Sequence, residues 1–162
     1  NSTSMNIAIY GRPVNLNQIE LAETLVKLLI QSGHRVVLHS DYYVFLKQHL
    51  PLEPKMPVFT SHEEISSDID FLFSIGGDGT LLDTVSLVKD SKIPVVGVNA
   101  GRLGFLSSVS RENLEFAIDS LAKGHYSTDA RTLLRVESNF PIFEGQNIAL
   151  NEFTIHKKKR HR

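Results

Sequence analysis

The run Gly76-Gly77-Asp78-Gly79-Thr80 contains the residue types best suited to chemistry on a phosphate group. Glycines lack a Cβ atom, so a polyphosphate can approach their backbone N–H groups closely. Asp78 is the unusual member, because a carboxylate repels phosphate unless it binds a hydroxyl group or a metal ion instead. Both uses fit phosphoryl transfer to an alcohol, in which the aspartate accepts the hydroxyl proton and Mg²⁺ offsets charge on the donor. The run therefore predicts a phosphate-binding loop of Gly76, Gly77, Gly79 and Thr80 around a catalytic Asp78.

A tight turn in which Asp78 caps a helix explains the same five residues equally well. No Gly-x-x-x-x-Gly-Lys-Ser/Thr run occurs in the sequence, so the loop is not of the Walker type. Asp83 lies one turn further along the expected helix and could approach the phosphates, but we interpret it as a surface carboxylate.

Two further segments could join this site. The run from Gly97 to Leu106 (GVNAGRLGFL) contains three glycines, Arg102 and Phe105. The glycines could also serve tight packing, and Phe105 could be a core residue. The pair Asn151-Glu152 lies in an otherwise apolar segment. Neighbouring residues of a strand point to opposite faces, so one of the pair faces inward and needs a polar partner, unless the strand lies at an edge.

Apolar runs with strand-like composition alternate with segments of helical periodicity in the first three quarters of the chain. We expect strands at residues 5–10, 35–39, 69–75 and 93–98, and helices at 17–32, 42–50, 80–89 and 111–123, the last with Ser110 as its N-cap. This alternation predicts right-handed crossovers and an α/β fold with a mostly parallel sheet flanked by helices. Gly76 to Thr80 would then lie at the carboxyl edge of the sheet, where open α/β folds bind ligands.

The pattern changes after Gly124. Residues 132–137 and 148–156 are strand-like, with no helical segment between them. We expect an α/β nucleotide-binding domain at residues 5–124 and the first strands of an incomplete β-rich domain at 125–162. Asn1 to Ser4 precede Met5, which suits an initiator, so we expect those four residues to be a remnant of cloning.

Composition narrows the class of protein. The formal net charge is -1, which gives no reason to expect a nucleic-acid or anionic-membrane partner, and no apolar run approaches the length of a membrane helix. The chain has no cysteine, and its seven histidines are scattered without the spacing of metal ligands, so we assign no metal site to the protein. A cytoplasmic protein is the default expectation, with the basic residues 156–162 as a solvated end.

Taken together and in this order, GGDGT, GVNAGRLGFL and LNEFTIH resemble the NAD kinase family, and the similarity covers nearly the whole chain from Met5. The resemblance implies transfer of the γ-phosphate of ATP with Mg²⁺, or of a phosphate from inorganic polyphosphate, to NAD, which gives NADP. Asp78 would be the base for the 2′-hydroxyl of the adenosine ribose, and Gly79 would contact the same nucleotide. Asn151 and Glu152 would bind near the nicotinamide-side ribose, while Leu82 and Phe105 would enclose the adenine.

The resemblance also sets expectations about the whole protein. Family members continue past the Asn-Glu strand, so we expect this chain to be truncated at its carboxyl end and inactive alone. The family commonly forms dimers or tetramers, which implies a homo-oligomer. A lipid kinase of the diacylglycerol type is an alternative because it shares GGDGT, although the Gly-Thr-Asn run expected there is missing. A non-catalytic nucleotide-binding module is a second alternative.

Overall fold

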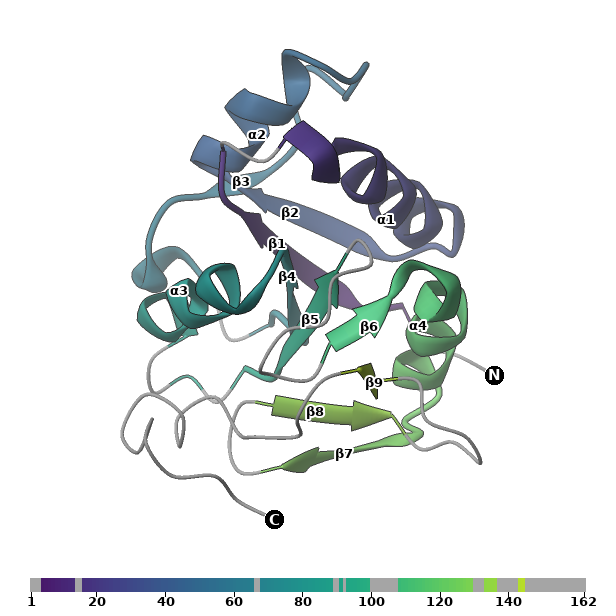
Figure 1. Cartoon of the computed structure of the whole chain (residues 1–162). Coiled ribbons are helices and arrows are strands. Elements are labelled where there is room, and N and C mark those ends of the chain that lie inside the picture. Colours follow the sequence, from purple (N-terminus) through teal and green to yellow (C-terminus); the bar gives the residue numbers. More distant parts are fainter. Residues whose placement is uncertain are drawn as a thin grey trace.

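Six parallel strands form the sheet at the centre of the molecule (Figure 1). The computed structural model describes residues 4–13, 16–65, 68–88, 91, 93–99, 108–129, 133–136 and 143–144. The parallel strands are β1 (Asn6–Gly11), β2 (Arg35–His39), β3 (Val58–Phe59), β4 (Phe71–Ile75), β5 (Val95–Asn99) and β6 (Ser108–Ser110). They lie in the order β3-β2-β1-β4-β5-β6. The expected α/β fold with a mostly parallel sheet is confirmed.

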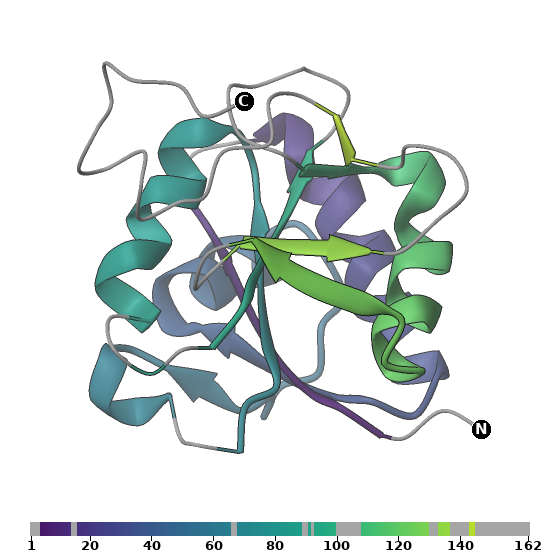
Figure 2. The same cartoon turned by 90° about the horizontal axis from the view of Figure 1, so that it is seen from below.

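Helices cover both faces of this sheet. They are α1 (Ile19–Gln31), α2 (Ser40–Lys47), α3 (Asp78–Val88) and α4 (Leu114–Ala122), with short 3-10 helices at Leu16–Gln18, His62–Glu64 and Arg111–Asn113. In Figure 2, α3 lies on one side of the strands and α4 on the other. Ile7 and Ile9 of β1 belong to the core cluster that contains the buried residues of α1 and α4, whereas Ala8 belongs to the cluster under α3. The alternation of strand side chains thus divides the core in two.

The strand order reverses next to β1. From β1 the chain moves outward through β2 and β3, and then crosses back to β4 on the other side of β1. Open α/β sheets bind ligands at such a reversal, in the crevice beyond the carboxyl ends of the two strands. Gly11 of β1 is in register with Ile75 of β4, so the segments that follow these residues leave the sheet side by side. Arg12 and the segment that begins at Gly76 therefore lie where the fold predicts a ligand site.

Three further strands lie beside the parallel ones. β7 (Tyr126–Asp129) and β8 (Leu133–Val136) pair antiparallel, and β8 meets β5 through Leu133 and Val95. β9 (Phe143–Glu144) pairs antiparallel with β6. β8 confirms the strand expected at 132–137, while the strand expected at 148–156 lies outside the described residues. The domain boundary after Gly124 stays a prediction.

The expected elements agree with the structure in type and differ at their ends. α3 begins at Asp78, two residues before the expected start, because the N–H of Leu81 already bonds to the carbonyl oxygen of Gly77 at 3.0 Å. α2 occupies residues 40–47 rather than 42–50, since Ser40 follows β2 directly and a turn follows Lys47.

The last helix begins differently from the expectation. Its first three residues form a 3-10 turn, and the side chain of Ser110 makes no capping hydrogen bond to the backbone. The Ser110 hydroxyl instead accepts a hydrogen bond from Nδ2 of Asn113 at 3.2 Å. Ser110 is therefore the N-cap residue of this turn, as predicted, but its side chain does not bond to the first amides of the turn.

Candidate functional site

The loop after β4 begins with a glycine that the backbone itself requires. Gly76 has a φ of 147°, a conformation that L side chains rarely adopt, and its N–H donates to the carbonyl oxygen of Val98 at 2.9 Å. A Cβ atom on Gly76 would lie 2.5 Å from Oγ1 of Thr80, whose residue is 3% exposed. Gly76 and Thr80 therefore have a structural role in the turn, and their contact with phosphate stays a prediction.

Gly77 differs from Gly76 in its surroundings. Its φ is not positive, and a Cβ atom on it would meet no heavy atom of the described protein within 4 Å. Neither backbone conformation nor internal packing therefore requires a glycine at position 77. Open space beside a backbone amide is what a phosphate group needs in order to approach.

Asp78 is the first residue of α3 and is half-buried, directly beyond the carboxyl end of β4. The amino-terminal end of a helix is a favourable place for a negatively charged side chain. Leu82, one turn further on, is half-buried against the core cluster under α3. The structure thus brings Asp78, Gly79 and the glycine loop together at the reversal of strand order.

A cluster of polar side chains ties the end of β1 to this helix. Arg12 donates from Nε to Oδ2 of Asp83 at 2.6 Å and from Nη2 to Oδ1 at 3.0 Å. The hydroxyl of Tyr10 donates to the same Oδ2 at 2.7 Å. Arg12 also donates from Nη2 to the carbonyl oxygen of Gly79 at 3.2 Å. The first two turns of α3 are therefore held by Tyr10 of β1 and by Arg12, which follows β1.

Arg12 and Asp83 each stabilise the charged form of the other. The hydrogen bond from Arg12 lowers the pKa of Asp83 below its ordinary value, and the same bond raises the pKa of Arg12. Burial, followed by the hydrogen bond to Asp83, raises the pKa of Tyr10 to about 12. At neutral pH the cluster consequently contains a guanidinium, a carboxylate and a neutral phenol.

Sequence reasoning missed Tyr10 and Arg12 and interpreted Asp83 as a surface carboxylate. The side chain of Asp83 is 31% exposed and is paired, so that interpretation was incomplete. A signal did exist, because Arg12 comes directly after a buried strand that ends at the same edge of the sheet as the glycine loop. Four other residues considered in the sequence, Arg102, Phe105, Asn151 and Glu152, lie outside the described residues, and their roles stay predictions.

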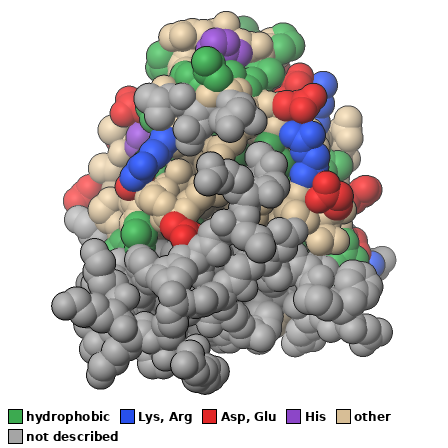
Figure 3. Space-filling view, viewed as in Figure 1, with side chains coloured by type: hydrophobic (Ala, Val, Ile, Leu, Met, Phe, Trp, Pro, Cys, Tyr) green, Lys and Arg blue, Asp and Glu red, His purple; other side chains and the backbone are tan. Residues whose placement is uncertain are grey.

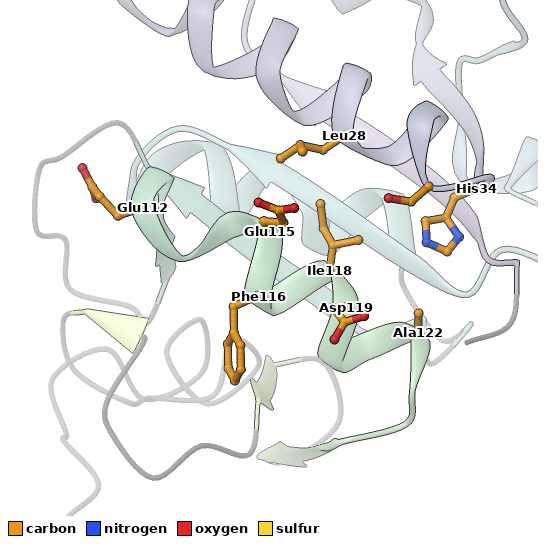
Figure 4. A pocket seen from close by; sticks show the side chains of 9 residues that line it. Leu28, His34, Glu112, Glu115, Phe116, Ile118, Asp119 and Ala122 are labelled. Atoms are coloured by element: carbon orange, nitrogen blue, oxygen red, sulfur yellow. The ribbon is translucent and has the colours of Figure 1, made fainter. Parts of the chain in front are cut away.

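A concave surface lies between the end of α1 and α4 (Figure 4). Its volume is about 680 Å³, and it is lined by Leu28, Ser32, His34, Glu112, Glu115, Phe116, Ile118, Asp119 and Ala122. Three of these residues carry carboxylates, which would repel a polyphosphate. This groove is therefore a poor site for the chemistry that the glycine loop suggests.

Charges of both signs are interspersed on the described surface seen in Figure 3. Ion pairs join Glu23 to Lys27 at 3.3 Å and Glu20 to Arg111 at 3.2 Å. Within the part of the chain that the structure describes, no helix is long and apolar enough to cross a membrane.

Comparison with known proteins places the fold and the loop in one family. The family model for the ATP-NAD kinase N-terminal domain matches residues 7–126. The chain belongs to the NAD kinase family. This match favours NAD kinases over the lipid kinases that share the GGDGT loop.

Individual relatives agree with the family match. The NAD kinase of Cytophaga hutchinsonii is 36% identical over 155 residues, and that of Christiangramia forsetii is 32% identical over 158 residues. Each alignment covers 95% of this chain and 53% of the relative. A bifunctional NADP phosphatase/NAD kinase of Methanococcus maripaludis is 36% identical over 94% of this chain. The chain thus spans about half the length of the NAD kinases it matches.

A solved structure supports the fold. The crystal structure of yeast NADH kinase complexed with NADH superposes with a TM-score of 0.59 and 22% sequence identity, over 91% of this chain and 45% of that chain. At this level of identity the likeness concerns the fold alone.

Proposed function

We propose that this chain supplies the nucleotide-binding part and the catalytic base of an NAD kinase. The enzyme would transfer the γ-phosphate of ATP, or a terminal phosphate of inorganic polyphosphate, to the 2′-hydroxyl of the adenosine ribose of NAD. With ATP, the ribose oxygen bonds to the γ-phosphorus, the bond to the β,γ-bridging oxygen breaks, and ADP leaves as NADP forms. The hydroxyl proton passes to the carboxylate of Asp78.

The position of Asp78 carries this proposal. Its carboxylate begins α3 at the reversal of strand order, and Gly77 beside it adjoins open space. The N–H groups at the start of the helix and the glycine loop suit the phosphates of the donor or of NAD. The transfer step chiefly needs positioning and charge stabilisation, and a glycine loop that carries one carboxylate at the start of a helix suits both needs.

The residues at this site fit Mg²⁺ when the ion arrives with the donor. Among the described residues, no group of three or more His, Asp or Glu side chains could hold a metal ion by itself. Mg²⁺ is commonly bound by one or two carboxylates together with substrate phosphates, and Asp78 could supply one such ligand. The ion would offset negative charge on the transferring phosphate. NAD and ATP are thus the proposed partners, in a homo-oligomer like those common in the family.

The test is an assay of the protein with its complete natural chain. We expect NADP to form from NAD, ATP and Mg²⁺, and we expect ³¹P NMR to show a phosphate monoester at the 2′ position. Polyphosphate in place of ATP tests the second donor. If neither donor yields NADP from NAD or NADPH from NADH, the proposal is wrong, and phosphorylation of diacylglycerol by the same preparation would favour the lipid-kinase alternative.

A further inference from the structure

The first turn of α3 is held from outside the helix by one side chain. The guanidinium of Arg12 binds both carboxylate oxygens of Asp83 and also binds the carbonyl oxygen of Gly79, which follows Asp78 directly. A two-point arginine–carboxylate pair fixes orientation as well as distance, because both groups are planar. Arg12 therefore constrains α3 at two levels, at Gly79 and one turn later at Asp83.

Gly79 makes this close contact possible. A Cβ atom at position 79 would lie 3.1 Å from Nη1 and 3.3 Å from Nη2 of Arg12, which is tighter than ordinary contact. The guanidinium consequently lies against the backbone of the turn that carries Asp78. This explains a glycine at position 79 without any ligand, whereas the space beside Gly77 is open.

The cluster is better suited to fixing a geometry than to stabilising the fold. The side chain of Arg12 is 46% exposed and that of Asp83 is 31% exposed, and ion pairs this accessible to water contribute little to stability. The hydroxyl of Tyr10 also donates to Oδ2 of Asp83, the oxygen that accepts from Nε of Arg12. The three side chains together thus fix the orientation of the start of α3 at the edge where β1 and β4 end.

We propose that Arg12 is a positioning residue for phosphoryl transfer, because its bonds to Asp83 and Gly79 set the orientation in which Asp78 meets the ribose hydroxyl. This inference rests on the proposed function for the reaction itself. Arg12 is assigned no direct contact with substrate. Tyr10 supports Arg12 by fixing the shared partner Asp83.

The kinetic test uses Arg12→Met and Arg12→Lys in the protein with its complete natural chain. Misplacement of a reacting group by about 1 Å can cost about 10²-fold in rate, so we expect Arg12→Met to lower kcat by about 10- to 100-fold. We expect the KM values for NAD and ATP to change less than about threefold, because Arg12 does not bind them. Arg12→Lys keeps the charge but loses the two-point pair, so it should recover only part of kcat.

Arg111→Met is the matched control. Arg111 also forms an exposed ion pair, with Glu20 at 3.2 Å, but it lies on the first turn before α4. We expect this variant to keep the kcat of the unaltered protein. An unchanged kcat in Arg12→Met would overturn the inference, and so would a loss confined to the KM for ATP, since that result would make Arg12 a phosphate-binding residue.

A second readout separates this inference from the proposed function. Native-state hydrogen exchange reports the order of backbone amides without any reaction. We expect the amides of residues 77–81 to exchange at least about tenfold faster in Arg12→Met than in Arg111→Met, with the central strands unchanged. If the unaltered protein makes no NADP, the proposed function is wrong, and equal exchange in the two variants would then overturn the positioning role independently.

Discussion

The two ends of the parallel strands use polar groups in different ways. At the amino edge, polar side chains bond to backbone: Nδ1 of His34 accepts the N–H of Met5 at 3.0 Å, and Asp70 accepts the N–H of Asn6 at 2.8 Å. At the carboxyl edge, Tyr10, Arg12 and Asp83 bond mainly to one another. The first arrangement satisfies strand ends, which serves stability. The second holds side chains in a fixed relation around a loop with open space, which serves a site.

The aspartates on either side of β4 give the sharpest contrast between the edges. Asp70 precedes this strand and Asp78 follows it. We expect Asp78→Asn to lower kcat by about 10²- to 10⁴-fold, because an amide cannot accept the hydroxyl proton. Asp70→Asn keeps an oxygen that can accept the N–H of Asn6, so its kcat should stay within about twofold of the unaltered protein. Steady-state kinetics on both variants measures the difference, and equal losses would contradict a special role for the carboxyl edge.

The two adjacent glycines at the carboxyl edge, Gly76 and Gly77, should differ in their effect on stability. Gly76→Ala forces a side chain onto a φ of 147°, and strain of this kind costs about 1–3 kcal/mol in the free energy of unfolding. Gly77→Ala meets open space, so its free energy of unfolding should change by less than about 0.5 kcal/mol.

For ligand binding we expect the opposite order, with the larger effect at Gly77. A methyl group at position 77 would enter the space proposed for phosphate, and we expect the KM for ATP or NAD to rise about tenfold, equivalent to about 1.4 kcal/mol. Urea denaturation and steady-state kinetics together check both variants. If Gly77→Ala unfolds readily and binds normally, the open space has no role in binding.

The amino edge should make the stability of the protein depend on pH. Burial lowers the pKa of His34 from the ordinary value of 6.5, so the folded protein binds this proton less readily than the unfolded chain does. The contribution to stability is therefore complete above about pH 6.5 and is lost as the pH falls towards the folded-state pKa. A protonated Nδ1 can no longer accept the N–H of Met5.

Thermal unfolding between pH 7.5 and 5 measures this effect. His34→Asn retains an acceptor near the same place and should flatten the dependence, at a cost of about 1 kcal/mol in the free energy of unfolding at neutral pH. His125→Asn is the control for replacing a histidine at an exposed position. An unchanged slope in His34→Asn would assign the pH dependence to other groups. Neither variant should alter kcat.

The sequence predicts the elements around the site better than the contacts within it. β4, the glycine loop and α3 are evident because an apolar run stops abruptly at two glycines and helical periodicity follows. The pair of Arg12 and Asp83 spans 71 residues of sequence, and it depends on β1 lying beside β4, which no local pattern specifies. Strands of two or three residues, such as β3 and β9, are too short to show a period.

The different roles of the three loop glycines could not be predicted from the sequence either. All three glycines of the loop were predicted to bind phosphate for the same reason, the lack of a Cβ atom. In the structure Gly76 adopts a positive φ that other residues rarely adopt, and Gly79 lies against the guanidinium of Arg12. Of the three, only Gly77 adjoins open space. Such distinctions depend on neighbours brought together by folding.

A crystal structure of the protein with its complete natural chain and bound NAD tests the central claim most directly. We predict that the adenosine ribose lies beyond the carboxyl ends of β1 and β4, with its 2′-hydroxyl within about 3 Å of the Asp78 carboxylate. NAD bound in the groove between α1 and α4, or at the amino edge of the sheet, would contradict the assignment of the site.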